Sequence, residues 1–139
     1  MIILSVDVGD VRTGVAVSDK NEGFAFPRGV ITERRRDVLI EKLCEMAKTE
    51  KAELIVVGYP KNMDGSEGFK AQECAAVAER LQEHSGIKTV LWDERCTTVS
   101  AHTYLNYTDT RGKKRKEVVD TVAAVIILED YMKFKKNQA

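Results

Sequence analysis

Residues 2–18 read IILSVDVGDVRTGVAVS, and this stretch determines the fold more than any other part of the chain. Its first half, residues 2–8, is a short run of mostly β-branched apolar residues that ends at Gly9-Asp10, which is typical of a buried strand. Residues 13–18 have the character of a second strand. The connection between the two is short enough only for a hairpin, so we expect the chain to begin with antiparallel strands.

The remaining sequence continues this hairpin into an alternating pattern. A third strand is expected near 24–32, and further strands at 54–57 and 87–92 are separated by segments with apolar residues at helical spacing. The expected helices are 37–51, 67–84 (with Ser66 as N-cap and Gly86 at its end), 98–105 and 117–133. Strands separated by helices need crossover connections and therefore run parallel to the first strand. The sequence predicts an α/β fold in one domain over 1–139: a five-stranded mixed sheet, three antiparallel strands then two parallel ones, flanked by helices.

The composition is that of a soluble globular protein. The chain has 139 residues, 43% of them hydrophobic, and a formal net charge of zero. It contains no apolar run near the roughly 20 residues that a membrane-spanning helix needs, and its first residues lack the basic region of a signal peptide. Its cysteines, which favour neither a disulfide framework nor a zinc site, are Cys44, Cys74 and Cys96. We therefore expect a cytoplasmic protein with reduced thiols.

Basic residues are concentrated in short runs despite the neutral total. Five of the six residues at 111–116 are Lys or Arg, residues 34–36 are all Arg, and a third group lies at 133–136. Such runs are usually solvated surface. The run at 111–116 attracts more interest because an unusually placed acidic residue, Asp120, follows it closely.

Three acidic residues occupy positions where a carboxylate is costly. Asp7 lies between two valines near the end of the first strand, Glu94 follows the fifth strand, and Asp120 lies on the last helix in register with Ala123, Ala124 and Ile127. Each has an ordinary explanation when taken alone: a turn cap, an ion pair with Arg95 or a lysine, or a favourable interaction with the helix dipole. Together they are expected at the edge formed by the carboxyl ends of the strands, where α/β folds bind ligands.

Carboxylates that converge in this way repel one another unless a cation lies between them. Oxygen ligands without nearby His or Cys favour Mg²⁺ or Mn²⁺ over Zn²⁺. Two such ions held by Asp7, Glu94 and Asp120 are suited to phosphodiester cleavage. The basic residues Lys113, Lys114, Arg115 and Lys116, together with Arg12, Lys61 and Asn62 on the same edge, are the candidates for binding nucleic-acid phosphates.

Four motifs that cover nearly the whole chain resemble the YqgF family of bacterial ribonuclease H-like proteins, also called Holliday junction resolvases or pre-16S rRNA nucleases. The motifs are DVG followed by RTGVAVS (7–9 and 12–18), GYPKNMDGS (58–66), DERCTT (93–98) and DTVAA (120–124). The resemblance implies an endonuclease for structured nucleic acid that matures the 5′ end of 16S rRNA, with the small ribosomal subunit as a partner. It assigns the acidic triad to Asp7, Glu94 and Asp120, and it adds Arg95 and Thr97 as nucleic-acid contacts.

Several alternatives remain open at this stage. Asp93 competes with Glu94 for the metal, since strand alternation separates the two residues without saying which face meets the ions. Tyr59, Lys61 and Cys96 depart from the residues usual in the family. Branched DNA is a possible substrate besides precursor rRNA, and the protein is expected as a monomer or homodimer. A non-catalytic RNA-binding factor and, more distantly, an ATPase with a similar first motif are the other readings.

Overall fold

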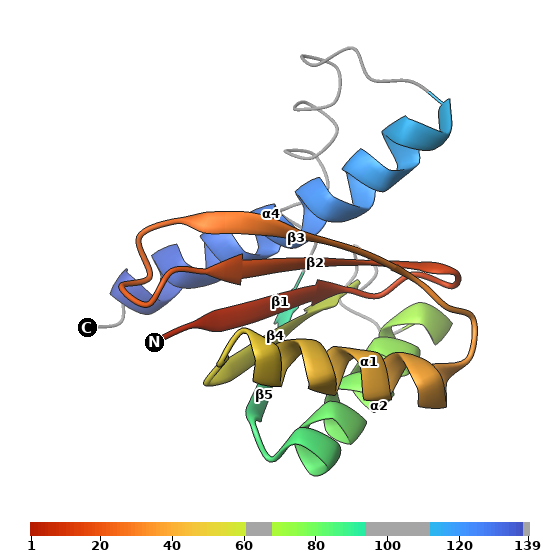
Figure 1. Ribbon diagram of the computed structural model, residues 1–139, viewed down its shortest axis with the longest axis horizontal. Helices are drawn as coiled ribbons and strands as arrows, with labels where there is room; N and C mark the ends of the chain where they lie inside the picture. Colours follow the sequence, from red (N-terminus) through yellow and green to blue (C-terminus); the bar gives the residue numbers. More distant parts are fainter. Residues whose placement is uncertain (61–67, 94–111, 138–139) are drawn as a thin grey trace.

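A computed structural model describes residues 1–60, 68–93 and 112–137 of the chain; for residues 112–120 the description covers the backbone (Figure 1). The described elements follow the predicted order. They are β1 (Ile3–Asp7), β2 (Arg12–Ser18), β3 (Ala25–Thr32), α1 (Arg36–Thr49), β4 (Leu54–Tyr59), α2 (Phe69–Ser85), β5 (Lys88–Asp93) and α4 (Gly112–Asn137). The helix expected at 98–105 lies outside the described residues.

The five strands form one mixed sheet in the order β3-β2-β1-β4-β5. β1 pairs antiparallel with β2 and parallel with β4, while the outer pairs are antiparallel β2–β3 and parallel β4–β5. The predicted mixed sheet is therefore confirmed, with β1 at its centre. Because β1 has a hydrogen-bonded strand on each side, a polar side chain on it is surrounded by protein and needs a bonding partner.

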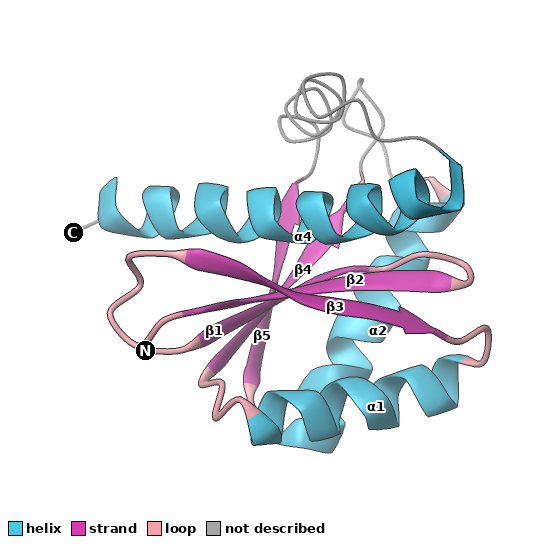
Figure 2. Ribbon diagram, turned by 45° about the horizontal axis from the view of Figure 1, so that its top comes forward, coloured by secondary structure: helices cyan, strands magenta, loops and turns pink. Residues whose placement is uncertain are grey.

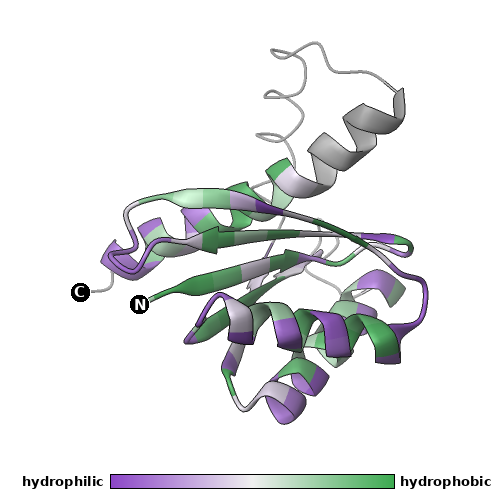
Figure 3. Cartoon of the chain, in the orientation of Figure 1, coloured by the Kyte–Doolittle hydropathy of each residue, from purple (hydrophilic) through white to green (hydrophobic). Residues whose placement is uncertain are grey.

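Helices cover the two faces of the sheet unequally. α1 and α2 pack together on one face, and α4 lies across the other (Figure 2). β1 supplies both cores by strand alternation: Leu4 and Val6, with Val8 just after the strand, pack toward α1 and α2, whereas Ile3 packs toward α4. Figure 3 shows the resulting apolar strands between helices whose outer surfaces are polar. Cys44 on α1 and Cys74 on α2 are buried in the first of these cores.

The ends of α2 illustrate one success and one error of the sequence prediction. Gly86 adopts a left-handed conformation (φ 71°) and caps the end of the helix, as its position predicts. The predicted N-cap, Ser66, is wrong, because Gly68 occupies the cap position and the helix begins at Phe69. Glycine is tolerated there because an N-cap residue has an extended backbone, and no side-chain bond caps this end.

The last helix is longer than predicted. We expected it to begin near residue 117 after a basic loop, but the backbone is already helical at Gly112. The basic run is therefore mostly the first turns of α4. Lys and Arg are good helix formers, so a charged run does not by itself indicate a loop. No described helix is both long and apolar enough to cross a membrane.

Candidate functional site

Asp7 is the last residue of the central strand and is half-buried. Alternation along β1 places it on the same face as Ile3 and Ser5, which is the face covered by α4. Ser5, fully buried, donates a hydrogen bond from Oγ to the carbonyl oxygen of Ala124 at 2.6 Å. The carboxylate thus lies two residues beyond the point where α4 is attached to β1.

Glycines occupy the neighbouring strands beside Asp7. Gly14 on β2 is its antiparallel partner. On the other side Val6 pairs with Val57 in the parallel ladder, so the next residues, Asp7 and Gly58, lie side by side. Residues in register point to the same face of a sheet. Neither strand therefore places a side chain directly beside the Asp7 carboxylate, and this arrangement suits a residue that must accept a ligand.

The position of Asp120 is on α4, the helix that covers this face. It is four residues before Ala124, the residue bonded to Ser5, which is about one helical turn. Ala124 and Ile127 are fully buried against the sheet, so the register of α4 on β1 is fixed by packing as well as by the Ser5 hydrogen bond. Small residues at this contact allow the helix to approach the strands closely.

Asp93, the last residue of β5, lies on the opposite side of the sheet from Asp7. Trp92 packs with the cluster under α4, in ring contact with Tyr131 and Phe134. Asp93 pairs with Tyr59 on β4. Tyr59 is two residues after Val57, which packs in the core under α1 and α2, so the two residues share that face. Alternation therefore places Asp93 on the face opposite Asp7.

The turn that follows Asp7 is held from several directions. The Gly9 amide donates to Thr13 Oγ1 at 3.4 Å, and Thr13 is fully buried. The Val11 carbonyl accepts from the Glu33 amide at 2.7 Å. The Gly9 carbonyl accepts from Arg36 Nη1 at 3.0 Å. Backbone on both sides of the turn is thus fixed to β2, to the end of β3 and to the start of α1.

Arg36 connects this turn to the start of α2. Its Nε donates to Glu73 Oε1 at 2.9 Å, and its Nη2 bonds the same oxygen and lies 4.0 Å from Asp10 Oδ1. Lys70 adds a bond from Nζ to Asp10 Oδ1 at 3.3 Å. The sequence grouped Arg36 with its neighbours as one basic run, but its side chain is only 20% exposed and its guanidinium bonds partners within the fold.

Replacing Arg36 with Gln should loosen the turn after Asp7. We expect a loss of about 1–3 kcal/mol in the free energy of unfolding, since charged hydrogen bonds in partly buried positions have this magnitude. Arg36→Lys should not restore it, because an ammonium cannot reproduce the planar fork. Chemical denaturation measures the effect. Arg35→Gln is the matched control, because Arg35 is 72% exposed and its ion pair with Asp37 is a surface one. Equal losses of stability in the two variants would show that the bonds of Arg36 to Gly9 and Glu73 do not stabilise the turn.

The structure places the predicted site residues unevenly. Asp7 and Arg12, at the end of β1 and the start of β2, lie at the same edge of the sheet. Asp120 and the basic residues at 113–116 belong to the first turns of α4, where the backbone alone is described. The predicted residues outside the described part of the chain are Lys61, Asn62, Glu94, Arg95 and Thr97. Accordingly, no three metal-ligating side chains gather within the described residues.

Sequence reasoning missed the residues that support Asp7. Gly14 and Gly58 were visible as glycines in or after apolar runs, a signal for close approach of a ligand or backbone, but their pairing with Asp7 depends on strand register. Ser5 was visible as a polar residue within an apolar strand. Nothing in the sequence indicated that Arg36, rather than its two neighbours, would reach Gly9.

The fold resembles that of resolvases in the ribonuclease H-like class. RuvC of T. thermophilus in complex with a Holliday junction substrate superimposes with a TM-score of 0.63 at 11% identity, over 100% of this chain and 98% of RuvC. The resolvase of Fowlpox virus in complex with Holliday junction DNA gives 0.57 at 13% identity, over 97% and 99%. At this identity the likeness concerns the fold, and it identifies the sheet with its flanking helices as ribonuclease H-like.

Sequence comparison then gives the family. Residues 1–134 match the model of RuvX, described as a Holliday junction resolvase. Proteins named "Putative pre-16S rRNA nuclease" are 40% identical in Caldanaerobacter subterraneus subsp. tengcongensis, over 99% of both chains, and in Bacillus cytotoxicus, over 97% of this chain and 100% of the relative. The chain belongs to the RuvX family, which is the YqgF family that its motifs resemble.

Proposed function

We propose that this protein is a divalent-metal-dependent endonuclease that hydrolyses phosphodiester bonds in structured nucleic acid. The observation that carries the proposal is the half-buried Asp7 at the end of the central strand, on the face where Ser5 holds α4 and with it the Asp120 position. A divalent cation is a partner that a half-buried carboxylate can share with other acids. Binding a metal ion would account for an acid at the end of the central strand, next to the helix that carries a second acid, Asp120.

Glu94 is the better candidate than Asp93 for the third ligand. Asp93 belongs to the face covered by α1 and α2, whereas Trp92 belongs to the face of Asp7. Asp93 is thereby set apart from Asp7, which leaves Glu94 of the same motif as the proposed third ligand. We therefore retain Asp7, Glu94 and Asp120 as the proposed triad, and we assign Asp93 no part in metal binding.

The proposed donor set fits Mg²⁺ or Mn²⁺. Carboxylate oxygens are the ligands these hard cations prefer, and the glycines beside Asp7 remove the nearest side chains that could obstruct an ion. When bound, a pair of such ions supplies an activated water and stabilises the leaving oxygen. The protein's own contribution would be to fix the end of β1, which carries Asp7, relative to α4, through the Ser5–Ala124 bond and the bonded turn at Gly9.

Basic residues on the same edge are proposed to bind the substrate's phosphates. Arg12 begins β2 next to the turn that follows Asp7. The run at 113–116 precedes Asp120 on the same helix, separated from it by one to two turns. Lys61, Asn62, Arg95 and Thr97 are proposed from their motifs. Phosphate contacts of this kind add affinity that decreases with salt.

Precursor 16S rRNA is the substrate we favour. The relatives at 40% identity carry that activity in their names, and they match this chain over nearly its whole length. We propose that the protein acts on the 5′ end of the precursor in the cytoplasm, in contact with the small ribosomal subunit, as a monomer or homodimer. Four-way DNA junctions are the second candidate, which the description of the family favours.

Incubating the purified protein with the two substrates side by side tests the proposal. We expect cleavage of precursor 16S rRNA in Mn²⁺ or Mg²⁺, none after chelation, and weaker cleavage of a four-way junction. Mapping the product ends distinguishes a specific 5′ cut from general degradation. Symmetrical cutting of the junction with intact RNA would instead favour the resolvase. Binding of RNA without cleavage in any metal would favour a non-catalytic assembly factor.

A further inference from the structure

A groove at the opposite end of the molecule from Asp7 lies between the β2–β3 turn and the last turns of α4. It has a volume of about 390 Å³ and is lined on the sheet side by the turn and on the helix side by α4 residues; the lining residues that matter here are Phe24, Glu129, Lys133 and Lys136. Neither the acidic site nor the basic run at 113–116 belongs to it. Glu129, Lys133 and Lys136 are four and three residues apart, so they share one face of α4.

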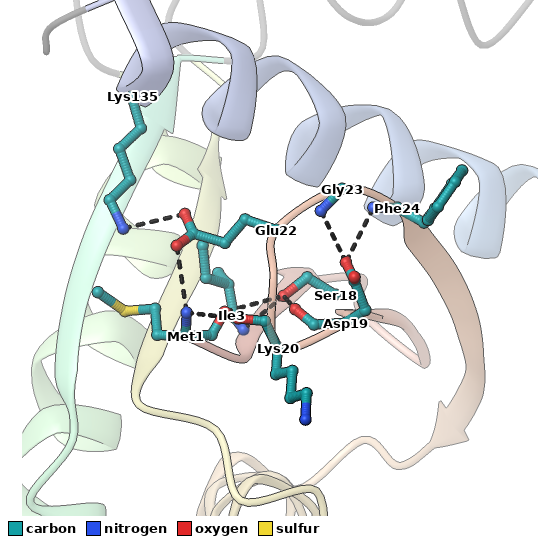
Figure 4. Close-up of polar contacts among 9 residues, drawn as sticks. All are labelled: Met1, Ile3, Ser18, Asp19, Lys20, Glu22, Gly23, Phe24 and Lys135. Atoms are coloured by element: carbon teal, nitrogen blue, oxygen red, sulfur yellow. Dashed lines mark hydrogen bonds and ion pairs between the residues drawn. The ribbon is translucent and has the colours of Figure 1, made fainter.

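The turn presents Phe24 to solvent in a fixed position. Asp19 Oδ1 accepts hydrogen bonds from the amides of Gly23 at 2.7 Å and Phe24 at 2.9 Å (Figure 4). These bonds, the Phe24 one first, hold the pKa of Asp19 below its ordinary value. The Phe24 side chain is nevertheless 68% exposed, and its ring lies 6.2 Å from that of Phe26. An exposed aromatic ring on an ordered turn is well suited to stack on a planar ligand.

The charges of the groove favour an anion over a cation. Glu22, the acid of the turn that lines the groove, is matched by Lys135 Nζ at 3.0 Å and by the amino group of Met1 at 3.2 Å (Figure 4). Ion pairs among the described residues do not use Lys133 or Lys136. In the lining itself two lysines therefore face one remaining carboxylate, Glu129; Asp130, whose charge interacts with Lys133, is outside the lining.

We propose that this groove binds an unpaired nucleotide stretch of the substrate, with a base stacked on Phe24 and its phosphates on Lys133 and Lys136. The proposal rests on the nuclease function above. Aromatic rings flanked by cations are the usual means of binding single strands, because every base has a face to stack. Glu129 is placed to accept a hydrogen bond from the amino group of such a base, as carboxylates do from cytosine.

Helix α4 connects the groove to the proposed catalytic edge. Asp120 and Lys133 are 13 residues apart on it, which corresponds to about 20 Å along the helix axis. With roughly 3.4 Å between stacked nucleotides, a strand needs about six nucleotides to cover that span. A substrate whose single-stranded part ends fewer than about six nucleotides from the cut should therefore be unable to occupy the catalytic edge and the groove at once.

The test compares a long and a short substrate, extending about twelve and about three nucleotides beyond the mapped cut. Binding is measured without divalent metal and cleavage with it. Phe24→Ala and the double change Lys133→Gln with Lys136→Gln should each weaken binding of the long substrate about tenfold, the usual effect of removing one stacking or clamping contact. Binding of the short substrate should be unchanged. Lys48→Gln with Lys88→Gln, on exposed residues away from the groove, is the control that alters net charge equally.

Two results would overturn the groove proposal while leaving the nuclease intact. One is an equal loss for long and short substrates, and the other is a loss as large in the Lys48–Lys88 control, which would indicate general electrostatics. Parent protein that neither binds nor cleaves either substrate would overturn the proposed function as well. Because Phe24 is exposed, its truncation should leave the unfolding midpoint within a degree or two of the parent's, on the scale of surface changes.

Discussion

Asp7→Asn should reduce cleavage by at least about a hundredfold and leave the fold intact. Loss of groups that merely orient metal ligands commonly costs 10–100-fold, so a ligand itself should cost no less. An amide is nearly isosteric with the carboxylate but carries no charge to hold a divalent cation. The half-buried position between Gly14 and Gly58 accommodates either group. Single-turnover cleavage in Mn²⁺ measures the loss, and thermal unfolding without metal checks the fold.

The adjacent turn offers a matched control for this change. Asp10 is three residues farther along, and its side chain is 84% exposed. Asp10→Asn removes the same charge from nearly the same place, and its bond to Lys70 is a surface ion pair of small energetic value. Asp10→Asn should therefore cleave at a rate close to the parent's. Full activity in purified Asp7→Asn would refute the acidic site and favour the RNA-binding alternative.

Gly9→Ala should have the largest effect on stability of any small substitution near the site. A Cβ at this position would lie 1.9 Å from the carbonyl oxygen of Arg12 and 3.1 Å from its carbonyl carbon. Both atoms are backbone, so no side chain can move aside and the turn itself must open. The hydrogen bonds of Gly9 with Thr13 and Arg36 would be displaced together. We expect a loss of about 2–4 kcal/mol, in the range of overpacked or strained sites.

Denaturant midpoints and cleavage rates together test this expectation. Gly23→Ala is the control, because the nearest atoms to its added Cβ are the Asp19 carboxylate oxygens at 3.7 and 3.9 Å, an ordinary contact. That variant should unfold close to the parent's midpoint. Gly9→Ala should also lose activity beyond its loss of stability, because the turn adjoins Asp7. A Gly9→Ala protein as stable as Gly23→Ala would show that the turn relaxes more easily than its geometry indicates.

The fold was largely predictable because its determinants are local. The apolar runs, the short first connection and the helical periods give the strand directions without knowledge of any long-range contact. Errors arose where a local pattern has two meanings. The basic run at 111–116 suits a loop or a helix equally well, and the backbone is helical from Gly112 onward. Ser66 has the chemistry of an N-cap, but the chain reaches that geometry at Gly68.

The candidate site was predictable only in part. A carboxylate in a central strand is conspicuous in any sequence, so Asp7 could be named from its valine neighbours. The residues around Asp7 could not be predicted. The glycines beside it and the contact of Ser5 with Ala124 depend on the register between segments that are up to 119 positions apart in the sequence. The face on which Asp93 lies likewise could not be told without knowing which helix covers the face of Trp92. Composition carries no information about either.

Helix α4 is longer than the strand to which it is fastened. Its 26 residues span about 39 Å, against about 17 Å for the five residues of β1, and Figure 1 shows its first turns continuing past the sheet. Ala124 is anchored, so the preceding turns behave as a spacer of set length. Adding one residue between Asp120 and Ala124 would swing everything upstream by about 100° about the axis. The number of residues in this overhang therefore fixes the direction in which the Asp120 position and the basic residues before it leave the helix axis.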